Sequence, residues 1–272
     1  MSKLTWDLSE YAVLENRQIP CASNLPKRYD DASGIRIDSP GRRALKTILW
    51  PLFSLRHELI GTAFIERALG RWIRELWRKD TAFLEVGCGN MALRKYIPRD
   101  CYYNAFDISL SEFHLRRALH DNRRINIALA SATDIPLATS VSDLIVSVST
   151  LTSIPDIAGA LAEIHRVAKP GATFLCVIHN GTSDKYIGRS HVECVHSWSF
   201  DEFRELAAHH GFECVKAHMG GWWFPCRKLF GIIPVNWHLP FKSRQPSKNA
   251  YLFYMFNVGK NADPTSKDVT RQ

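Results

Sequence analysis

The chain has 272 residues, 46% of them hydrophobic and 23% charged, and its formal net charge is +8. This length accommodates one α/β domain with additions, or at most two small domains, and the composition excludes bulk disorder. The moderate basic charge permits an acidic partner, such as nucleic acid or an anionic membrane surface, but does not require one.

The cysteines and the N-terminus bear on the compartment. The seven cysteines, at positions 21, 88, 101, 176, 194, 214 and 226, form no CxxC pair, and several lie within apolar runs. Such a pattern is typical of reduced thiols in a reducing compartment. Residues 1–7 lack the apolar core of a signal peptide, and the apolar run at 48–53 is too short to span a bilayer. We therefore expect a soluble, cytoplasmic protein.

Strand and helix patterns alternate along most of the chain. Residues 1–40 are polar and poorly periodic, which favours an irregular extension. Hydrophobic patterns then predict strands at 81–86, 102–106, 125–130, 143–148, 172–178, 212–217 and 251–256. Helical periodicity predicts helices at 56–79, 110–121, 156–168 and 200–210. This alternation predicts a mostly parallel sheet with right-handed crossovers.

The helix at 56–79 has two distinct faces. Apolar residues recur at 65, 69, 72 and 76, and arginines recur at 67, 71, 74 and 78. A basic amphipathic helix could lie on a membrane or contact an acidic substrate. The arginines could equally form the solvated face of a packed helix.

Residues 83–90 (FLEVGCGN) carry the most specific local signal. A strand runs into a glycine turn, and a helix-like run at 91–96 follows, which presents backbone N–H groups to the polar end of a cofactor. Asp107 follows about twenty residues later, the spacing of a ribose-binding carboxylate. Met91 stands where a third glycine would suit a pyrophosphate, so the turn favours a cofactor without phosphates. The alternative is a glycine turn with a purely steric role.

Three segments, the first of them part of this turn, together carry a resemblance. Residues 84–89 (LEVGCG), 132–137 (ATDIPL) with 142–147 (SDLIVS), and 161–172 (LAEIHRVAKPGA) together resemble the class I S-adenosylmethionine-dependent methyltransferases. The likeness is greatest to the small-molecule and quinone-biosynthesis branch, methyltransferase type 11. It covers residues 80–180, with a weaker echo at 199–212.

The resemblance implies a fold and a division of the chain. The fold is a Rossmann-like α/β architecture with helices on both faces of a seven-stranded, mostly parallel sheet. The strand at 251–256 would supply its antiparallel last strand. Residues 1–55 would form an irregular or helical extension, 56–258 the methyltransferase domain and 259–272 a mobile tail.

The resemblance also implies that S-adenosyl-L-methionine is the cofactor. The implied cofactor-binding residues are Glu85, Gly87, Cys88, Gly89, Asp107, Ile108, Thr133, Asp134, Ile135 and Val148. In this family Asp107 would bind the ribose hydroxyls and Asp134 the adenine amino group. Alternatively, Asp107 caps the helix at 110 and Asp134 is a turn residue. The hydroxylated run 149–153 departs from relatives that place aromatic or histidine residues there.

Methyl transfer from a sulfonium depends mainly on positioning and exclusion of water, and needs a base only where the acceptor must lose a proton. His179 and His191 are the candidate bases, because they follow the strand at 172–178 at the edge where reacting groups gather. The alternative for each is a surface or capping histidine. His191, Cys194 and His196 lack a fourth ligand, so no metal site is expected.

Candidate substrate residues are Asn180, Trp222, Trp223 and Trp237. The three tryptophans belong to an aromatic-rich segment at 218–245 that we expect to cover the acceptor, although they could equally be core or a dimer contact. Tyr29 and Trp50 could close the other side of the pocket.

The leading hypothesis is a methyltransferase that acts on a small-molecule or lipid-like acceptor by in-line displacement. The alternatives are a non-catalytic cofactor-binding protein with this fold, or an RNA methyltransferase, which the net charge alone suggests. Nucleic acid is not expected as a partner, because no RNA-binding module is recognisable. Peripheral membrane contact and a homodimer stay open.

Overall fold

The computed structural model describes residues 3–14, 17–23, 25, 35–36, 38–60, 62–121, 123–186, 194–229 and 233–259. Its helices are α1 (Pro40–Ile60), α2 (Ala63–Leu76), α3 (Glu112–His120), α4 (Ile157–Val167) and α5 (Phe200–His209). Its strands are β1 (Glu10–Leu14), β2 (Arg17–Cys21), β3 (Ile35–Arg36), β4 (Phe83–Val86), β5 (Tyr102–Asp107), β6 (Leu110–Ser111), β7 (Arg124–Leu129), β8 (Ser142–Val148), β9 (Ala168–His179), β10 (Phe212–Leu229), β11 (Ile233–Leu239) and β12 (Asn249–Val258). Its 3₁₀ turns are η1 (Ala92–Tyr96), η2 (Leu151–Ser153) and η3 (Pro246–Lys248).

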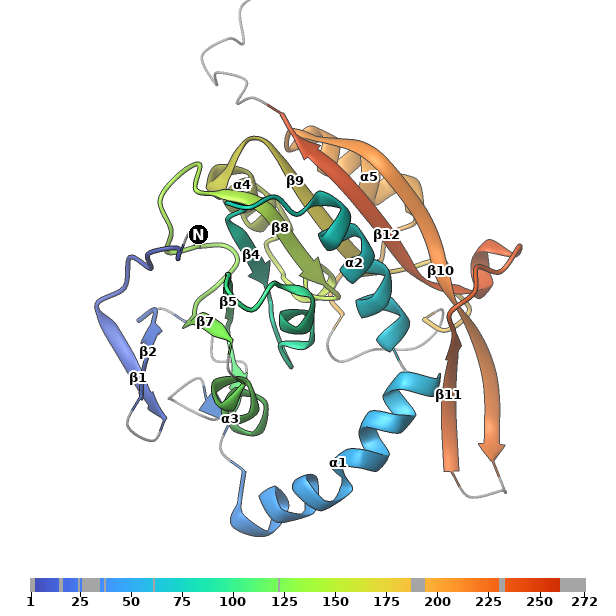
Figure 1. Ribbon diagram of the computed structural model, residues 1–272. Coiled ribbons are helices and arrows are strands. Elements are labelled where there is room, and N and C mark those ends of the chain that lie inside the picture. The colour runs from blue at the N-terminus through green and yellow to red at the C-terminus, as the bar shows by residue number, and fades with distance from the viewer. Residues whose placement is uncertain are drawn as a thin grey trace, which may run out of the picture.

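A ten-stranded sheet forms the centre of the molecule, in the order β1-β2-β7-β5-β4-β8-β9-β12-β10-β11 (Figure 1). The strands from β7 to β10 in this order are the expected seven-stranded sheet. Strands β7, β5, β4, β8 and β9 run parallel, and β12 is antiparallel to both of its neighbours. The predicted Rossmann-like fold with an antiparallel last strand is confirmed.

Helices cover both faces of this sheet (Figure 1). On one face, α2, η1 and α3 bury Leu69, Leu93 and Leu115 in a common apolar cluster. On the other, α4 and α5 bury Leu161 and Phe203. Strands buried on both sides read as nearly continuous apolar runs, which is why the central strands were predictable. Functional groups are therefore expected at the edge where the parallel strands end.

The first long helical region differs from the prediction. Helix α1 ends at Ile60 and α2 begins at Ala63, so the prediction of a single helix over 56–79 is wrong. Gly61 and Thr62 have low helix propensity, which favours a break at this point. Beyond the break, α2 keeps the predicted separation into an apolar and a basic face.

Residues near the N-terminus belong to the sheet rather than to an irregular extension. Leu4 is buried; its N–H donates to Asn104 Oδ1 at 3.0 Å, and its carbonyl accepts from Asn126 Nδ2 at 2.8 Å. The β1–β2 hairpin then adds two strands beside β7, where Cys21 pairs with Leu129. The expectation that residues 1–40 are irregular is therefore wrong for this part.

The aromatic-rich segment at 218–245 is a hairpin at the opposite edge of the sheet. Strand β10 continues through Gly220 and Gly221 and pairs with β11, with Phe224 opposite Trp237 (Figure 1). The predicted strand at 212–217 is therefore too short. Among the described residues, no helix is long and apolar enough to cross a bilayer.

Candidate functional site

The glycine turn after β4 is held by its own hydrogen bonds. The N–H groups of Gly87 and Cys88 both donate to Phe106 O, at 3.0 and 3.1 Å. The Gly89 N–H donates to Asp107 Oδ2 at 2.8 Å. The prediction that the turn presents its backbone N–H groups to a cofactor is therefore wrong for these three residues. The turn is instead tied to the end of β5, which fixes Asp107 beside it.

Met91 occupies the backbone conformation that a third glycine would take. Its φ of 56° lies in the left-handed region, and its side chain is fully buried. The conformation costs about 1–2 kcal/mol, and burial of the side chain contributes about 1.5–3 kcal/mol. Residue 91 therefore takes a left-handed conformation without being glycine, and η1 follows it directly.

Asp107 is the carboxylate closest to the turn. Its Oδ2 accepts from Gly89 N and its Oδ1 accepts from Ser109 N at 3.2 Å. Both carboxylate oxygens are thus held by backbone N–H groups, which fixes the orientation of the carboxylate. The N-cap of α3 is Ser111 rather than Asp107. The geometry therefore suits the ribose role that the family resemblance implies.

Glu85 lies beneath the turn, on β4. Its carboxyl group is buried and shares a hydrogen bond with the Tyr103 hydroxyl. The pKa of Glu85 is raised to about 8, mainly by burial; the hydrogen bond from Tyr103 opposes the shift, and the neighbouring Asp107 and Glu66 add to it. A carboxyl group perturbed in this way at the bottom of a site is typical of functional sites.

The loop after β7 forms a compact turn next to a cavity. Thr133 Oγ1 and Ser131 Oγ are 2.8 Å apart, and Ser131 and Asp134 form an isolated β-bridge. The Asp134 carboxylate is exposed and borders a cavity of about 430 Å³. Residues 7–10 and 21–23 form the opposite wall of this cavity, a contribution that the sequence did not reveal.

The other predicted cofactor residues divide into two groups. Ile108 and Val148 are partly buried, at the ends of β5 and β8. Cys88 and Ile135 are buried in the core, and burial raises the pKa of the Cys88 thiol well above its usual range. Their side chains pack within the apolar clusters, so these two residues can contact a cofactor only through their backbone atoms.

The hydroxylated run after β8 packs against the glycine turn. Thr150 Oγ1 donates to Gly87 O at 3.2 Å, and a Cβ on Gly87 would lie 2.2 Å from that hydroxyl oxygen. Gly87 has a φ of +73°, so both space and conformation require glycine there. At Gly89, by contrast, a Cβ would meet no atom within 4 Å.

His179 ends β9 at the same edge of the sheet. Its Nδ1 lies 3.3 Å from Thr152 Oγ1 and 3.2 Å from Cys194 Sγ. Its ring lies 4.9 Å from the Tyr186 ring and 5.6 Å from the Tyr251 ring, centroid to centroid. The predicted base is therefore part of a cluster of polar and aromatic side chains.

Lys185, Tyr186 and Tyr251 are site residues that sequence reasoning missed. Lys185 Nζ donates to the Tyr186 hydroxyl at 2.7 Å and lies 5.2 Å from the centre of the Tyr251 ring. Burial raises the pKa of Tyr251 to about 12 and raises that of Tyr186 further. Both phenols therefore stay protonated near neutral pH.

The remaining candidates have mainly structural surroundings. Asn180 is fully buried; its amide nitrogen donates to Asn249 O and its amide oxygen accepts from Thr182. Trp223 is buried in the core on the α2 face, and Trp222 is partly buried in β10. Trp50 packs against Phe113, with ring centroids 5.3 Å apart.

Some predictions fall outside the described residues, namely those on Tyr29, His191 and the Trp237 side chain. His196 is described: its Nε2 lies 2.8 Å from Ile154 O and its ring stacks on Trp198. Within the described ranges, no three His, Cys, Asp or Glu side chains are grouped as metal ligands.

The same substitution is expected to have different effects at the two glycines. Gly87→Ala is expected to destabilise the fold by about 2–4 kcal/mol, because left-handed strain adds to the clash with Thr150. Gly89→Ala is expected to cost about 1–2 kcal/mol from strain alone while its methyl group obstructs the space in front of the turn. Thermal melts and titration with S-adenosylhomocysteine would separate the effects. Equal melting losses for the two variants would contradict this assignment.

Comparisons with known proteins agree with this geometry. Residues 84–176 match the sequence model of a family described as "Methyltransferase domain". The mouse mitochondrial protein "Arginine-hydroxylase NDUFAF5" is 26% identical over 130 residues, which cover 47% of this chain and 36% of that protein. The match thus spans about a third of the length of the curated relatives.

Two solved structures show the likeness in fold. The 1,6-didemethyltoxoflavin-N1-methyltransferase of Burkholderia thailandensis, solved with its namesake ligand and S-adenosylhomocysteine, has a TM-score of 0.52 at 14% identity, covering 83% of this chain and 92% of that one. The [4+2]-cyclase SpnF has a TM-score of 0.52 at 14% identity, covering 71% and 80%. The chain therefore shares the fold of these proteins, and its residues 84–176 match the methyltransferase-domain model.

Proposed function

We propose that the protein transfers a methyl group from S-adenosylmethionine to a small-molecule or lipid-like acceptor. The observation that supports this most is the placement of Asp107, the glycine turn and the His179 cluster at one edge of the sheet. When bound, the cofactor supplies an activated methyl group for in-line displacement. The protein's own task is then to orient the acceptor and to exclude water.

The surroundings of His179 suit an aromatic acceptor. The rings of Tyr186 and Tyr251 pack against His179, and Phe64 continues the aromatic cluster, with its ring centroid 5.9 Å from that of Tyr251. Lys185 and the two phenol groups add hydrogen-bond donors that could orient a polar substituent. An aromatic surface that carries only a small number of polar groups favours a small acceptor over a nucleic acid.

We assign His179 as the group that takes a proton from the acceptor. Thr152 and Cys194 hold its Nδ1 edge, which orients the ring at the end of β9. Imidazole titrates near neutral pH, so it can serve as a general base.

The test combines binding with turnover. Purified protein is titrated with S-adenosylhomocysteine and then assayed with S-adenosylmethionine on a panel of phenols, catechols and aromatic amines. His179→Gln is expected to lower kcat about 10²-fold while cofactor affinity stays unchanged. In this variant kcat should no longer fall as the pH is lowered, because the base that becomes protonated is gone. His209→Gln, an exposed histidine on α5, is the matched control. An unchanged pH profile in His179→Gln would remove the base assignment.

A second candidate is a cofactor-binding protein that performs another reaction or none. Two similar proteins support this second candidate, because one fold can host unrelated chemistry. One relative is named as an arginine hydroxylase, and one solved structure is named as a cyclase. Cofactor binding without methylated product across the panel would support this candidate over the methyltransferase.

A further inference from the structure

A second cavity lies away from Asp107, between α2 and the strands β10 and β12. It encloses about 380 Å³. We call this cavity the cationic pocket. The residues that line it are Phe64, Arg67, Ala68, Arg71, Arg74, Tyr96, His218, Met219, Gly220, Gly221, Pro240, Lys242 and Phe253. A cavity of this size can enclose a small organic molecule.

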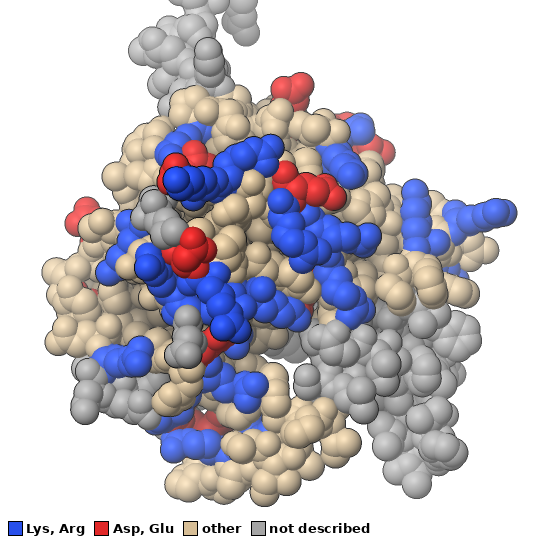
Figure 2. Space-filling model, viewed as in Figure 1, with Lys and Arg blue, Asp and Glu red and all other residues tan. Residues whose placement is uncertain are grey.

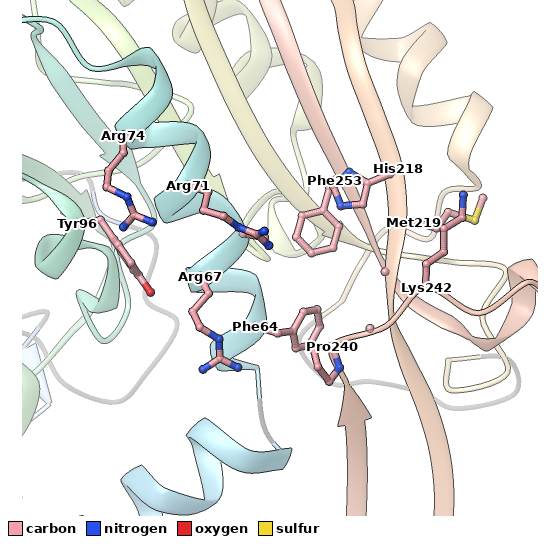
Figure 3. A pocket seen from close by; sticks show the side chains of 13 residues that line it. Phe64, Arg67, Arg71, Arg74, Tyr96, His218, Met219, Pro240, Lys242 and Phe253 are labelled. Carbon is pink, nitrogen blue, oxygen red and sulfur yellow. The ribbon is translucent and has the colours of Figure 1, made fainter.

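Positive charge dominates one wall of the cationic pocket. Arg67, Arg71 and Arg74 follow one another at helical spacing on a single face of α2. Figure 3 shows Arg67 and Arg71 extending from α2 beside Phe64 and Phe253, with Arg74 next to Tyr96. Figure 2 shows basic side chains gathered over α2. None of the described residues that line the pocket is acidic.

A row of like charges is unfavourable for the helix that carries it. Like charges at i, i+3 and i, i+4 destabilise a helix by about 0.2–0.5 kcal/mol per pair. Helix α2 has two acidic residues: Glu66 forms an ion pair with Lys95 of η1 at 2.9 Å, and Glu75 lies four residues after Arg71. Lys242 adds another cation from the strand side of the pocket. The surplus charge is thus concentrated around a cavity rather than spread over a surface.

The floor of the cationic pocket is flat and aromatic. His218 stacks on Phe253 with ring centroids 4.6 Å apart and an angle of 7° between the rings. Burial, together with Lys216, Lys242 and Arg71, lowers the pKa of His218, so this ring is uncharged near neutral pH. Phe64 continues the apolar surface, with its ring centroid 6.3 Å from that of Phe253.

We propose that the cationic pocket binds the phosphate group of an amphipathic molecule whose apolar part lies on this aromatic floor. Guanidinium groups bind phosphate oxygens in pairs, which favours arginine at such a site. The phosphate could belong to a soluble aryl or alkyl phosphate or to a lipid headgroup. The pocket binds its ligand without the methyl donor, so this inference does not depend on the proposed function.

The test measures phenyl phosphate binding to the full chain by calorimetry and by its effect on Tm. Phenol and inorganic phosphate serve as comparison probes, and phosphatidylglycerol vesicles form a separate arm. Arg71→Gln is expected to weaken phenyl phosphate binding about tenfold, because it removes a charge-assisted contact. Arg99→Gln, an exposed arginine outside the pocket, makes the same change in net charge and is the control.

The outcomes are distinguishable. Phenyl phosphate binding that exceeds both comparison probes and falls in Arg71→Gln supports a soluble ligand. Vesicle binding that falls in Arg71→Gln but not in Arg99→Gln supports a lipid headgroup. Equal effects of the two substitutions on every probe, or phenol binding as tight as phenyl phosphate binding, would overturn the proposal.

Discussion

Replacing Asp107 with alanine is expected to weaken S-adenosylhomocysteine binding at least about 100-fold. Hydrogen bonds to a charged group each contribute about 1.5–3 kcal/mol, and about 1.4 kcal/mol corresponds to a tenfold change in affinity. Two ribose hydroxyls bound by one carboxylate would account for such a loss. The carboxylate is already in place, because its oxygens accept from Gly89 N and Ser109 N.

The same contacts mean that Asp107→Ala also loosens the turn. Loss of an acceptor for two backbone N–H groups in a partly exposed position is expected to cost about 1–2 kcal/mol of folding free energy. Asp107→Asn separates the two effects, because its amide oxygen can still accept from the turn but its nitrogen cannot accept from a hydroxyl. Its single amide oxygen keeps one of the two backbone contacts, so we expect this variant to melt between the wild type and Asp107→Ala and to bind about tenfold more weakly.

Calorimetric titration and thermal melting of both variants make the measurement, with Asp100→Ala as a control at an exposed carboxylate. If Asp107→Ala binds S-adenosylhomocysteine with wild-type affinity, Asp107 has no ribose role. In that case its function is limited to holding the turn.

The centre of the fold could be predicted because its signals are local. Strand β8 was expected at 143–148 and spans Ser142–Val148, since its aliphatic run is buried on both sides. Helix α5 was predicted from Ser199, whose side chain forms a capping box with Glu202. The glycine turn and Asp107 are equally local, because a strand, a turn and the end of the next strand determine them.

The edges of the sheet could not be predicted because distant residues hold them. Leu4 is fixed by amides at Asn104 and Asn126, more than 95 residues away. The sequence pattern of residues 3–8 gives no indication of these two partners. At the other edge, Gly220 and Gly221 resemble a turn in sequence, yet β10 passes through them, and the ring of Phe64 occupies the space where a Cβ of residue 221 would lie.

The acceptor side of the site was predicted only in part for the same reason. His179 was identifiable because it directly follows an apolar strand. Tyr251 lies opposite His179 in the sheet register, whereas Lys185 and Tyr186 come from the loop after β9. Three segments converge there, and sequence spacing carries no information on their proximity. The arginines of α2 were predicted as a basic face, but the cavity beside them depends on β10 and β12.

Glu85 makes the stability of the protein without cofactor strongly dependent on pH. Its folded-state pKa of about 8 exceeds the ordinary value of 4.5, so the folded protein keeps a proton that the unfolded chain has lost between these values. Stability from this group is therefore complete below about pH 4.5 and is lost as the pH rises towards 8 and above. The loss is on the order of a few kcal/mol.

Glu85→Gln is expected to remove this dependence. The amide cannot ionise, and its oxygen can still accept from the Tyr103 hydroxyl. The variant should therefore match the wild type near pH 4.5 and exceed its Tm by several degrees at pH 9, since about 1 kcal/mol corresponds to 2–4 °C at this chain length. Thermal melts of both proteins from pH 4.5 to 9 give the difference between their Tm values at each pH. Titrating groups that the two proteins share cancel in this difference. A constant difference across that range would show that Glu85 ionises with an ordinary pKa.

The same carboxyl group links cofactor binding to protons. A ligand that brings positive charge near Glu85 favours its ionised form, so binding of S-adenosylmethionine at pH 7 should release a fraction of a proton from the wild type. Calorimetry in two buffers with different heats of ionisation measures this release directly. Glu85→Gln should bind with the same heat in both buffers, because no group beneath the turn is left to titrate. Equal proton release from the two proteins would place the titrating group elsewhere and leave Glu85 with a purely structural role.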